Sequence, residues 1–133
     1  MSIQKIRVLV AEDDTANALA ARKILEQLGC AVDVAAHGKQ AVELFRDRDY
    51  DLILMDSQMP VMNGLEATIR IRAMPGGPST PIVGTTSLPS NADCVAAGMN
   101  DVVPKPFLFD KMRQVLVRWT AWTGLPKADP CQA

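Results

Sequence analysis

The chain has 133 residues, of which 48% are hydrophobic and 22% charged, and its 14 basic and 15 acidic side chains give a formal net charge of −1. This length suits one globular domain, and the balanced charge argues against nucleic acid or an anionic membrane as a partner. The apolar runs are too short to span a membrane, and the N-terminus lacks the apolar core of a signal peptide. Three scattered cysteines fit neither a disulfide framework nor a metal cluster, so we expect a reducing, cytoplasmic location.

Five short runs rich in aliphatic residues are predicted to be strands. They are Ile6–Ala11, Ala31–Ala36, Leu52–Met55, Pro81–Thr85 and Asp101–Pro104. Segments with helical spacing lie between them, and we expect helices around residues 20–28, at Lys39–Arg48, at Gly64–Met74 and from about Leu108 to Trp122. This alternation predicts a doubly wound α/β fold, in which a five-stranded parallel sheet carries helices on both faces.

Two of the predicted strands end in acidic residues. The first is followed by Glu12, Asp13 and Asp14, and the third by Asp56. In a sheet of order 2-1-3-4-5, strands one and three are neighbours whose helices leave toward opposite faces, so a crevice opens between their carboxyl ends. This topology predicts that Asp13 and Asp56 lie at the edge of one pocket.

Carboxylates gathered in one crevice need a compensating charge. Two like charges about 4 Å apart repel by roughly 4 kcal/mol at an effective dielectric constant of about 20, so either protons are shared or a cation is bound. Oxygen ligands in a small site favour Mg²⁺, and these loops contain no His or Cys that would favour zinc. The alternative interpretation is that the acids lie at helix N-termini, where Asp14 or Thr15 suits a cap.

The fourth and fifth predicted strands end in hydroxyl and ammonium groups. Thr85, Thr86 and Ser87 close the fourth strand, and Lys105 follows the fifth. With a divalent cation beside them, these groups would form a receptor for a phosphoryl group, and Asp56 would be the nucleophile that accepts it.

Together these motifs resemble the receiver domain of two-component response regulators, the CheY-like family. The resemblance rests on Glu12-Asp13, on Asp56 followed by Met59-Pro60 and Asn63-Gly64, on Thr86, and on Lys105-Pro106, and it covers about residues 5 to 122. The stretches MDSQMPVMNGLEATIRIR and AAGMNDVVPKPF are similar to receivers of hybrid histidine kinases and phosphorelays. The resemblance implies a flavodoxin-like (βα)5 fold, with residues 1–122 as the receiver domain and residues 123–133 as a C-terminal tail or linker.

The resemblance also implies a role for each site residue. Asp56 would take a phosphoryl group from the phosphohistidine of a histidine kinase, of a histidine phosphotransfer protein or of a parent hybrid kinase chain. Asp13, Asp56 and the backbone carbonyl of Gln58 would bind Mg²⁺, with Mn²⁺ as a substitute, and Glu12 would hold a metal-bound water. Lys105 would pair with the phosphate, its bond to Pro106 would be cis, and Thr86 would hydrogen-bond a phosphoryl oxygen. The chain would then be a signalling phosphoacceptor that assists its own phosphorylation and dephosphorylation, and not an enzyme.

The sequence departs from the family pattern on one side of the predicted site. Val102 stands three residues before Lys105, where family members usually have Tyr or Phe, so a switch that couples this ring to Thr86 is in doubt. The stretch from Thr86 to Gly98 is also about three residues shorter than usual, close to one helical turn, so we expect a shortened fourth helix. We hypothesise that this face transmits little of the signal, which suits a phosphorelay, and we expect Leu88 to shield the phosphorylated aspartate from water.

The residues leave two other functions open. A degenerate receiver would bind partners without being phosphorylated, and a flavodoxin-like cofactor binder or a phosphatase could use the same fold. The acids at residues 12–14 argue against the flavin, because they would repel its phosphate. His37, the single histidine, precedes Gly38 in a predicted surface loop, and we therefore expect a phosphate acceptor and not a histidine carrier.

Overall fold

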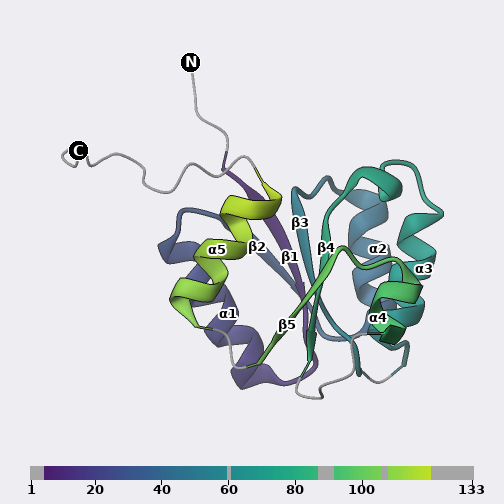
Figure 1. Cartoon of the computed structure of the whole chain (residues 1–133), viewed down its shortest axis with the longest axis horizontal. Coiled ribbons are helices and arrows are strands. Elements are labelled where there is room, and N and C mark those ends of the chain that lie inside the picture. Colours follow the sequence, from purple (N-terminus) through teal and green to yellow (C-terminus); the bar gives the residue numbers. More distant parts are fainter. Residues whose placement is uncertain (1–4, 60, 87–91, 106–107, 121–133) are drawn as a thin grey trace.

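The computed structural model describes residues 5–59, 61–86, 92–105 and 108–120, in which strands and helices alternate (Figure 1). The strands are β1 (Arg7–Ala11), β2 (Ala31–Ala35), β3 (Leu52–Asp56), β4 (Ile82–Thr86) and β5 (Asp101–Pro104). The helices are α1 (Thr15–Gln27), α2 (Gly38–Asp47), α3 (Gly64–Arg72), α4 (Ala92–Ala97) and α5 (Phe109–Trp119), and a 3-10 turn, η1 (Gly77–Ser79), precedes β4.

The strands form one parallel sheet of order β2-β1-β3-β4-β5, which confirms the predicted doubly wound topology. Helices α1 and α5 cover one face of the sheet, and α2, α3 and α4 cover the other (Figure 1). Side chains alternate along a strand, so neighbouring residues enter opposite cores. Val8 and Leu52 pack in the core that includes residues of α1 and α5, whereas Leu9 and Ile53 pack in the core on the α2 and α3 side.

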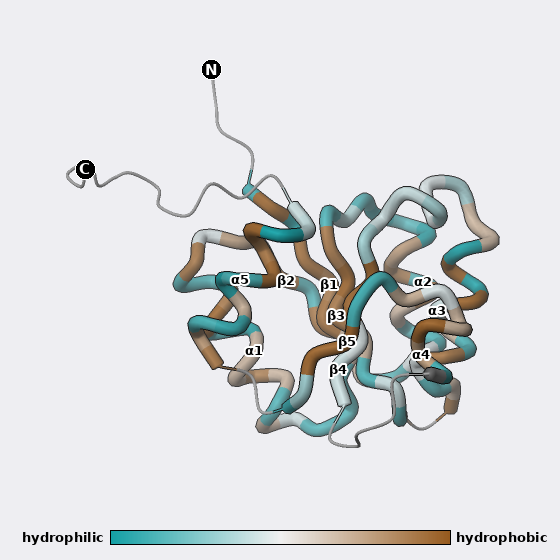
Figure 2. The backbone as a smooth tube through the Cα atoms, in the orientation of Figure 1, coloured by the Kyte–Doolittle hydropathy of each residue, from teal (hydrophilic) through white to brown (hydrophobic). Residues whose placement is uncertain are grey.

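The central strands are buried on both faces and are therefore hydrophobic almost without interruption. Figure 2 shows this as a concentration of hydrophobic residues along the middle of the sheet. All five residues of β3 are buried, and the last of them is Asp56. A carboxylate thus lies at the end of a strand that otherwise carries only apolar side chains.

Most predicted element boundaries are close to those of the structure, but helix α1 begins at Thr15, earlier than the range predicted around residues 20–28. Strand β3 includes Asp56, and helix α3 ends at Arg72 and not at Met74. The buried residues of α1 are Ala18, Ala21 and Leu25. Helix α5 ends at Trp119. The predicted end of that helix at Trp122 and the predicted tail at residues 123–133 lie outside the described residues.

Helix α4 has six residues, compared with nine to thirteen in the other α-helices of the described chain, which confirms the predicted shortening. The stretch that precedes it, with Leu88, lies outside the described residues. No helix in the described ranges is both long and apolar enough to traverse a lipid bilayer.

Candidate functional site

The carboxyl ends of four strands meet at one edge of the sheet. Ala11 pairs with Met55 in the register of β1 and β3, so the next residues, Glu12 and Asp56, are neighbours at this edge. On the other side of β3, Asp56 pairs with Thr85 of β4. The backbone N–H of Lys105, which follows β5, donates to the Thr86 carbonyl oxygen at 3.0 Å. The fold therefore gathers residues that are far apart in the sequence.

Lys105 bridges two buried carboxylates at this edge. Its Nζ lies 2.7 Å from Glu12 Oε1 and 3.1 Å from Asp56 Oδ2. The side chains of Glu12 and Asp56 are 1% and 6% exposed, and that of Lys105 is 15% exposed. A buried charge is stable only when it is paired, so the three groups depend on one another.

The surroundings shift the pKa of two of these groups. Burial raises the pKa of the Glu12 carboxyl group, although the hydrogen bond from Lys105 acts in the opposite direction. Burial also lowers the pKa of the Lys105 ammonium group, but its interactions with Glu12 and Asp56 outweigh this and leave that pKa raised. The two acids therefore stabilise the charged form of the Lys105 ammonium group.

The loop after β3 folds back onto Asp56. The backbone N–H of Gln58 donates to Asp56 Oδ1 at 3.1 Å, and the N–H of Gly64 donates to the Ser57 carbonyl oxygen at 3.2 Å. A side chain at Gly64 would collide with the Asp56 carbonyl oxygen, so only glycine permits α3 to start this close to the strand. One Asp56 carboxylate oxygen is thus fixed by the loop, and the other faces Lys105.

The residues at this edge fit a divalent cation. One oxygen atom from each of Glu12, Asp13 and Asp56 lies within 4.8 Å of the others, and this is the one such group of acidic or metal-ligating residues in the described ranges. Three carboxylates form a hard, oxygen-only donor set, which Mg²⁺ prefers. Asp13 is exposed while the other two are buried, so the site opens to solvent on one side, where water ligands of the ion would lie.

The remaining predicted site residues are placed as follows. Thr86 is the last residue of β4 and is 6% exposed, at the same edge of the sheet as Asp56. Gln58 is exposed and meets Asp56 through its backbone N–H. Val102 lies half-buried in β5. The predicted cis bond to Pro106 lies outside the described residues.

Helix capping explains only one acid of the first cluster. Asp14 is the N-cap of α1, and its side chain accepts a hydrogen bond from the Asn17 backbone N–H at 2.9 Å. Glu12 instead pairs with Lys105, while its Oε2 accepts the Asp14 backbone N–H at 3.1 Å. The capping alternative therefore holds for Asp14 and not for Glu12.

Comparison with known proteins decides the family. A family model described as "Response regulator receiver domain" matches residues 8–117. This range includes all five strands except Arg7, the first residue of β1. The chain belongs to this family. As a receiver domain it takes part in two-component and phosphorelay signalling.

Two curated relatives differ in how much of their own length the match covers. The two-component response regulator ORR41 of Oryza sativa subsp. japonica is 44% identical over 126 residues, which cover 90% of this receiver and 98% of ORR41. The aerobic respiration control sensor protein ArcB of Escherichia coli is 39% identical over 109 residues, which cover 80% of this receiver but only 14% of ArcB.

Two solved structures share the fold of this receiver. The receiver domain of the sensor histidine kinase PA1611 from Pseudomonas aeruginosa, with a magnesium ion coordinated in its active site cleft, has a TM-score of 0.82 and 37% identity, covering 87% of this chain and 98% of that one. A co-crystal structure of the Saccharomyces cerevisiae histidine phosphotransfer protein Ypd1 with the receiver domain of its response regulator Ssk1 matches with a TM-score of 0.81 and 25% identity, covering 97% and 98% of the two chains.

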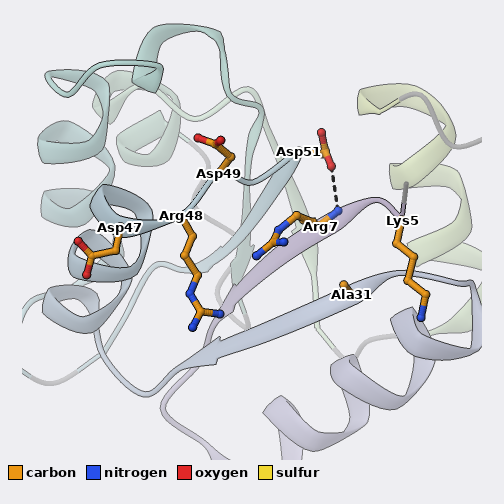
Figure 3. Close-up of a pocket in the computed structure, with 7 residues that line it drawn as sticks. All are labelled: Lys5, Arg7, Ala31, Asp47, Arg48, Asp49 and Asp51. Carbon is orange, nitrogen blue, oxygen red and sulfur yellow. Dashed lines mark hydrogen bonds between the residues drawn. The ribbon is translucent and has the colours of Figure 1, made fainter. Parts of the chain in front are cut away.

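A hollow of about 750 Å³ lies at the opposite edge of the receiver, near the amino ends of β1 and β2 (Figure 3). It is lined by Lys5, Arg7, Ala31, Asp47, Arg48, Asp49 and Asp51. Its acids alternate with cations, and the Arg7 backbone N–H donates to Asp51 at 2.8 Å. Because these acids form no cluster at metal-ligand distance, the acidic edge is the better candidate site of the receiver.

Two contacts near the site were not predicted from the sequence. Glu12 pairs directly with Lys105, which neither residue's neighbours in the sequence indicate. His37 is half-buried and forms the N-cap of α2, where its Nδ1 accepts the Gln40 backbone N–H at 3.1 Å, while Gln40 Oε1 accepts the Ala36 N–H at 2.7 Å. This pattern is a variant of the capping box, in which the glutamine accepts the N–H of the residue before the N-cap, and the glutamine three residues after His37 was its signal in the sequence.

Proposed function

We propose that this receiver accepts a phosphoryl group on Asp56 in a Mg²⁺-dependent reaction with a partner's phosphohistidine. An Asp56 carboxylate oxygen forms the new O–P bond while the N–P bond of the donor breaks, and the released imidazole retains the electron pair of that bond. The observation that carries the proposal is the convergence of Glu12, Asp13, Asp56 and Lys105 at one edge of the sheet.

Each residue supports one part of this reaction. Glu12, Asp13 and Asp56, with the Gln58 carbonyl oxygen, would hold Mg²⁺, which when bound neutralises charge on the phosphoryl oxygens. The Gln58 N–H fixes one Asp56 oxygen, so that the carboxylate is oriented before the donor arrives. Lys105 would move from Asp56 to a phosphoryl oxygen, and Thr86 would donate its hydroxyl hydrogen to another.

A partner protein must reach Asp56 across the surrounding loops. Leu19 in α1, Val61 in the loop after β3, and Leu108 and Phe109 at the start of α5 are large apolar side chains that are 46% to 76% exposed. Each lies in a segment that begins at the same edge of the sheet as Asp56. These residues support docking of a histidine kinase, a histidine phosphotransfer protein or a kinase module of the same chain.

The proposal is tested by intact mass measurement after incubation with acetyl phosphate or phosphoramidate. We expect the wild-type protein to gain the mass of one phosphoryl group when Mg²⁺ is present, and to gain none when the ion is chelated. The Asp56→Asn variant should gain none in either condition, because its amide cannot act as the nucleophile. Equal modification of Asp56→Asn and wild type would refute the proposal.

A degenerate receiver that only binds partners finds no support in the site. Glu12, Asp13, Asp56, Thr86 and Lys105 are all present and all lie at the same edge of the sheet. The family match likewise gives no support to a flavin-binding function.

A further inference from the structure

The loop that follows Asp56 is tied to helix α2 through a glycine. The backbone N–H of Gly38, the first residue of α2, donates to the Met62 carbonyl oxygen at 2.9 Å. A side chain at Gly38 would collide with this same oxygen and would lie 2.9 Å from the Met62 carbonyl carbon. Gly38 is buried, and Met62 is half-buried. The close approach of the two backbones therefore requires glycine.

Gly38 is held rigidly on its own side of this contact. The His37–Gln40 capping interactions fix the first turn of α2. Buried residues of α2, including Ala41 and Phe45, anchor the helix in the core that it shares with α3. The Gly38 N–H thus meets the loop after β3 from a fixed position.

The loop itself is strained where it meets Gly38. Val61, which directly precedes Met62, has φ of 68° and is 76% exposed. A β-branched residue is an outlier in this left-handed region, and such strain persists only where neighbouring contacts maintain it. The exposed Val61 side chain has little packing of its own, so the contact that maintains this conformation must involve its neighbours. Met62 supplies that contact through its bond with Gly38.

The same loop positions the phosphoacceptor. Its first part carries the Gln58 N–H that fixes Asp56 Oδ1, and its end reaches Gly64, whose N–H bonds to Ser57. We propose that Gly38 is a positioning residue for Asp56, acting through Met62 to hold the loop in the conformation that the metal and phosphoryl site needs. This inference rests on the proposed function and extends it to an element, α2, that contributes no residue to the acidic cluster.

The test compares two glycine-to-alanine variants. Gly77 is a matched control, because it is also buried and a side chain at this position would also collide with a backbone carbonyl oxygen, that of Ile71. Unlike Gly38, it lies in η1, before the amino end of β4. We expect Gly38→Ala to weaken Mg²⁺ binding about tenfold, as loss of a supporting contact around a metal site does, and to accelerate hydrogen exchange of the Gln58 N–H in the metal-free protein. Gly77→Ala should change neither the Mg²⁺ affinity nor the exchange rate of the Gln58 N–H, even if urea unfolding shows that it destabilises the protein as much as Gly38→Ala does.

A third variant tests the link to Val61. Glycine adopts φ near 68° without strain, so adding Val61→Gly to Gly38→Ala should recover most of the lost Mg²⁺ affinity and Gln58 protection. The proposal is overturned if Gly38→Ala behaves like Gly77→Ala, or if Val61→Gly restores neither quantity.

The wild-type protein provides an independent test in case Gly38→Ala does not fold. If one contact holds the loop, the Gly38 and Gln58 N–H groups should exchange through a common opening, with equal protection at several pH values. Exchange at Gln58 through an opening that leaves Gly38 protected would contradict the proposal. Because exchange needs no metal, a wild-type protein without Mg²⁺ affinity would count against the proposed function and not against this contact.

Discussion

At the scale of single residues, Lys105 determines how the acidic site is stabilised. One ammonium group neutralises Glu12 and Asp56 together, at 2.7 and 3.1 Å. Neither carboxylate is paired with another cation within the described residues. When Mg²⁺ and the phosphoryl group bind, they would enter a site whose charges are already paired. The fold would therefore not have to bury a new uncompensated charge.

A second set of polar side chains meets at Tyr50, a buried residue close to the amino end of β3. The Tyr50 hydroxyl group donates to Asp33 Oδ2 at 2.7 Å, and Arg48 Nη1 donates to the same oxygen at 3.1 Å. Burial, together with the hydrogen bond to Asp33, raises the pKa of Tyr50 well above its usual range. Tyr50 is the one tyrosine of the chain, so its ionisation can be followed without interference.

This shift predicts a loss of stability at alkaline pH. A folded-state pKa above the unfolded value of 10.0 means that the stabilisation is complete below pH 10.0 and declines as the pH rises from there toward the folded pKa. Stability should fall by up to about 1.4 kcal/mol per pH unit in that window. Urea unfolding of wild type and Tyr50→Phe from pH 9 to pH 11 checks this, since the variant lacks the ionising group. Parallel pH profiles for the two proteins, or a tyrosinate absorbance that appears at the ordinary pKa in the folded state, would contradict it.

The residues of the candidate site were predictable because each lies at the end of a strand or directly after it. Asp56 and Lys105 stand at such ends, and the structure brings them to 3.1 Å. Gly38 was not predictable as a contact of Met62, because the pattern of side chains gives no information about two backbones that meet. The Glu12–Lys105 pair was missed for a similar reason, since strand order places both residues at one edge but does not give their side-chain directions.

At the scale of elements, Arg72 connects the end of α3 to η1 and to the turn before β5. Its guanidinium group donates to the carbonyl oxygens of Gly77, Gly98 and Thr80 and to Asn100 Oδ1, at 2.6 to 2.9 Å. Asn100 in turn bonds to Ile82 in both directions, at 2.7 and 2.8 Å. Arginine suits this position because its planar fork serves several acceptors at once.

Removal of this group should be costly. We expect Arg72→Met to lower the free energy of unfolding by about 3 kcal/mol, because several part-buried carbonyl groups lose their donor. Arg70→Met is the matched control on the same helix, since Arg70 pairs only with the exposed Glu66 in the described structure, and it should cost about 0.5 kcal/mol or less. Urea denaturation measures both. Equal losses in the two variants would show that the Arg72 contacts add no net stability.

The same network predicts how far a phosphorylation signal spreads. Arg72 forms hydrogen bonds with both Gly98 and Asn100. The Met99 side chain packs against Gly84, in the space that a side chain on Gly84 would need. With Val102 in place of an aromatic ring and a short α4, we expect this corner to stay fixed when beryllofluoride binds as a phosphoryl mimic. NMR should show large amide shifts near Asp56 and small ones at residues 98–102. Large shifts at residues 98–102, together with newly created binding to an output protein, would contradict this view.

At the scale of the whole molecule, the two ends of the parallel strands carry different sets of polar residues. The carboxyl edge collects the acids, Thr86 and Lys105, and the amino edge collects mixed charges around an open hollow (Figure 3). The strand order could be predicted from two features of the sequence. Strands and helices alternate, and the runs that form β1 and β3 are hydrophobic enough for central strands, so few topologies are possible. The role of Arg72 depends on tertiary contacts, which periodicity does not encode, whereas the His37 cap is a local contact that the glutamine at position 40 signals.

The central claim is that strand ends far apart in the sequence form one cation site, and Mg²⁺ titration followed by NMR tests it most directly. Asp13 and Asp14 are adjacent exposed acids, but only Asp13 belongs to the cluster, while Asp14 caps α1. We predict saturable Mg²⁺ binding that Asp13→Asn weakens about tenfold or more and that Asp14→Asn, which keeps a good cap, changes by about twofold or less. Absence of saturable binding in the wild type, or an equal loss in both variants, would contradict the account.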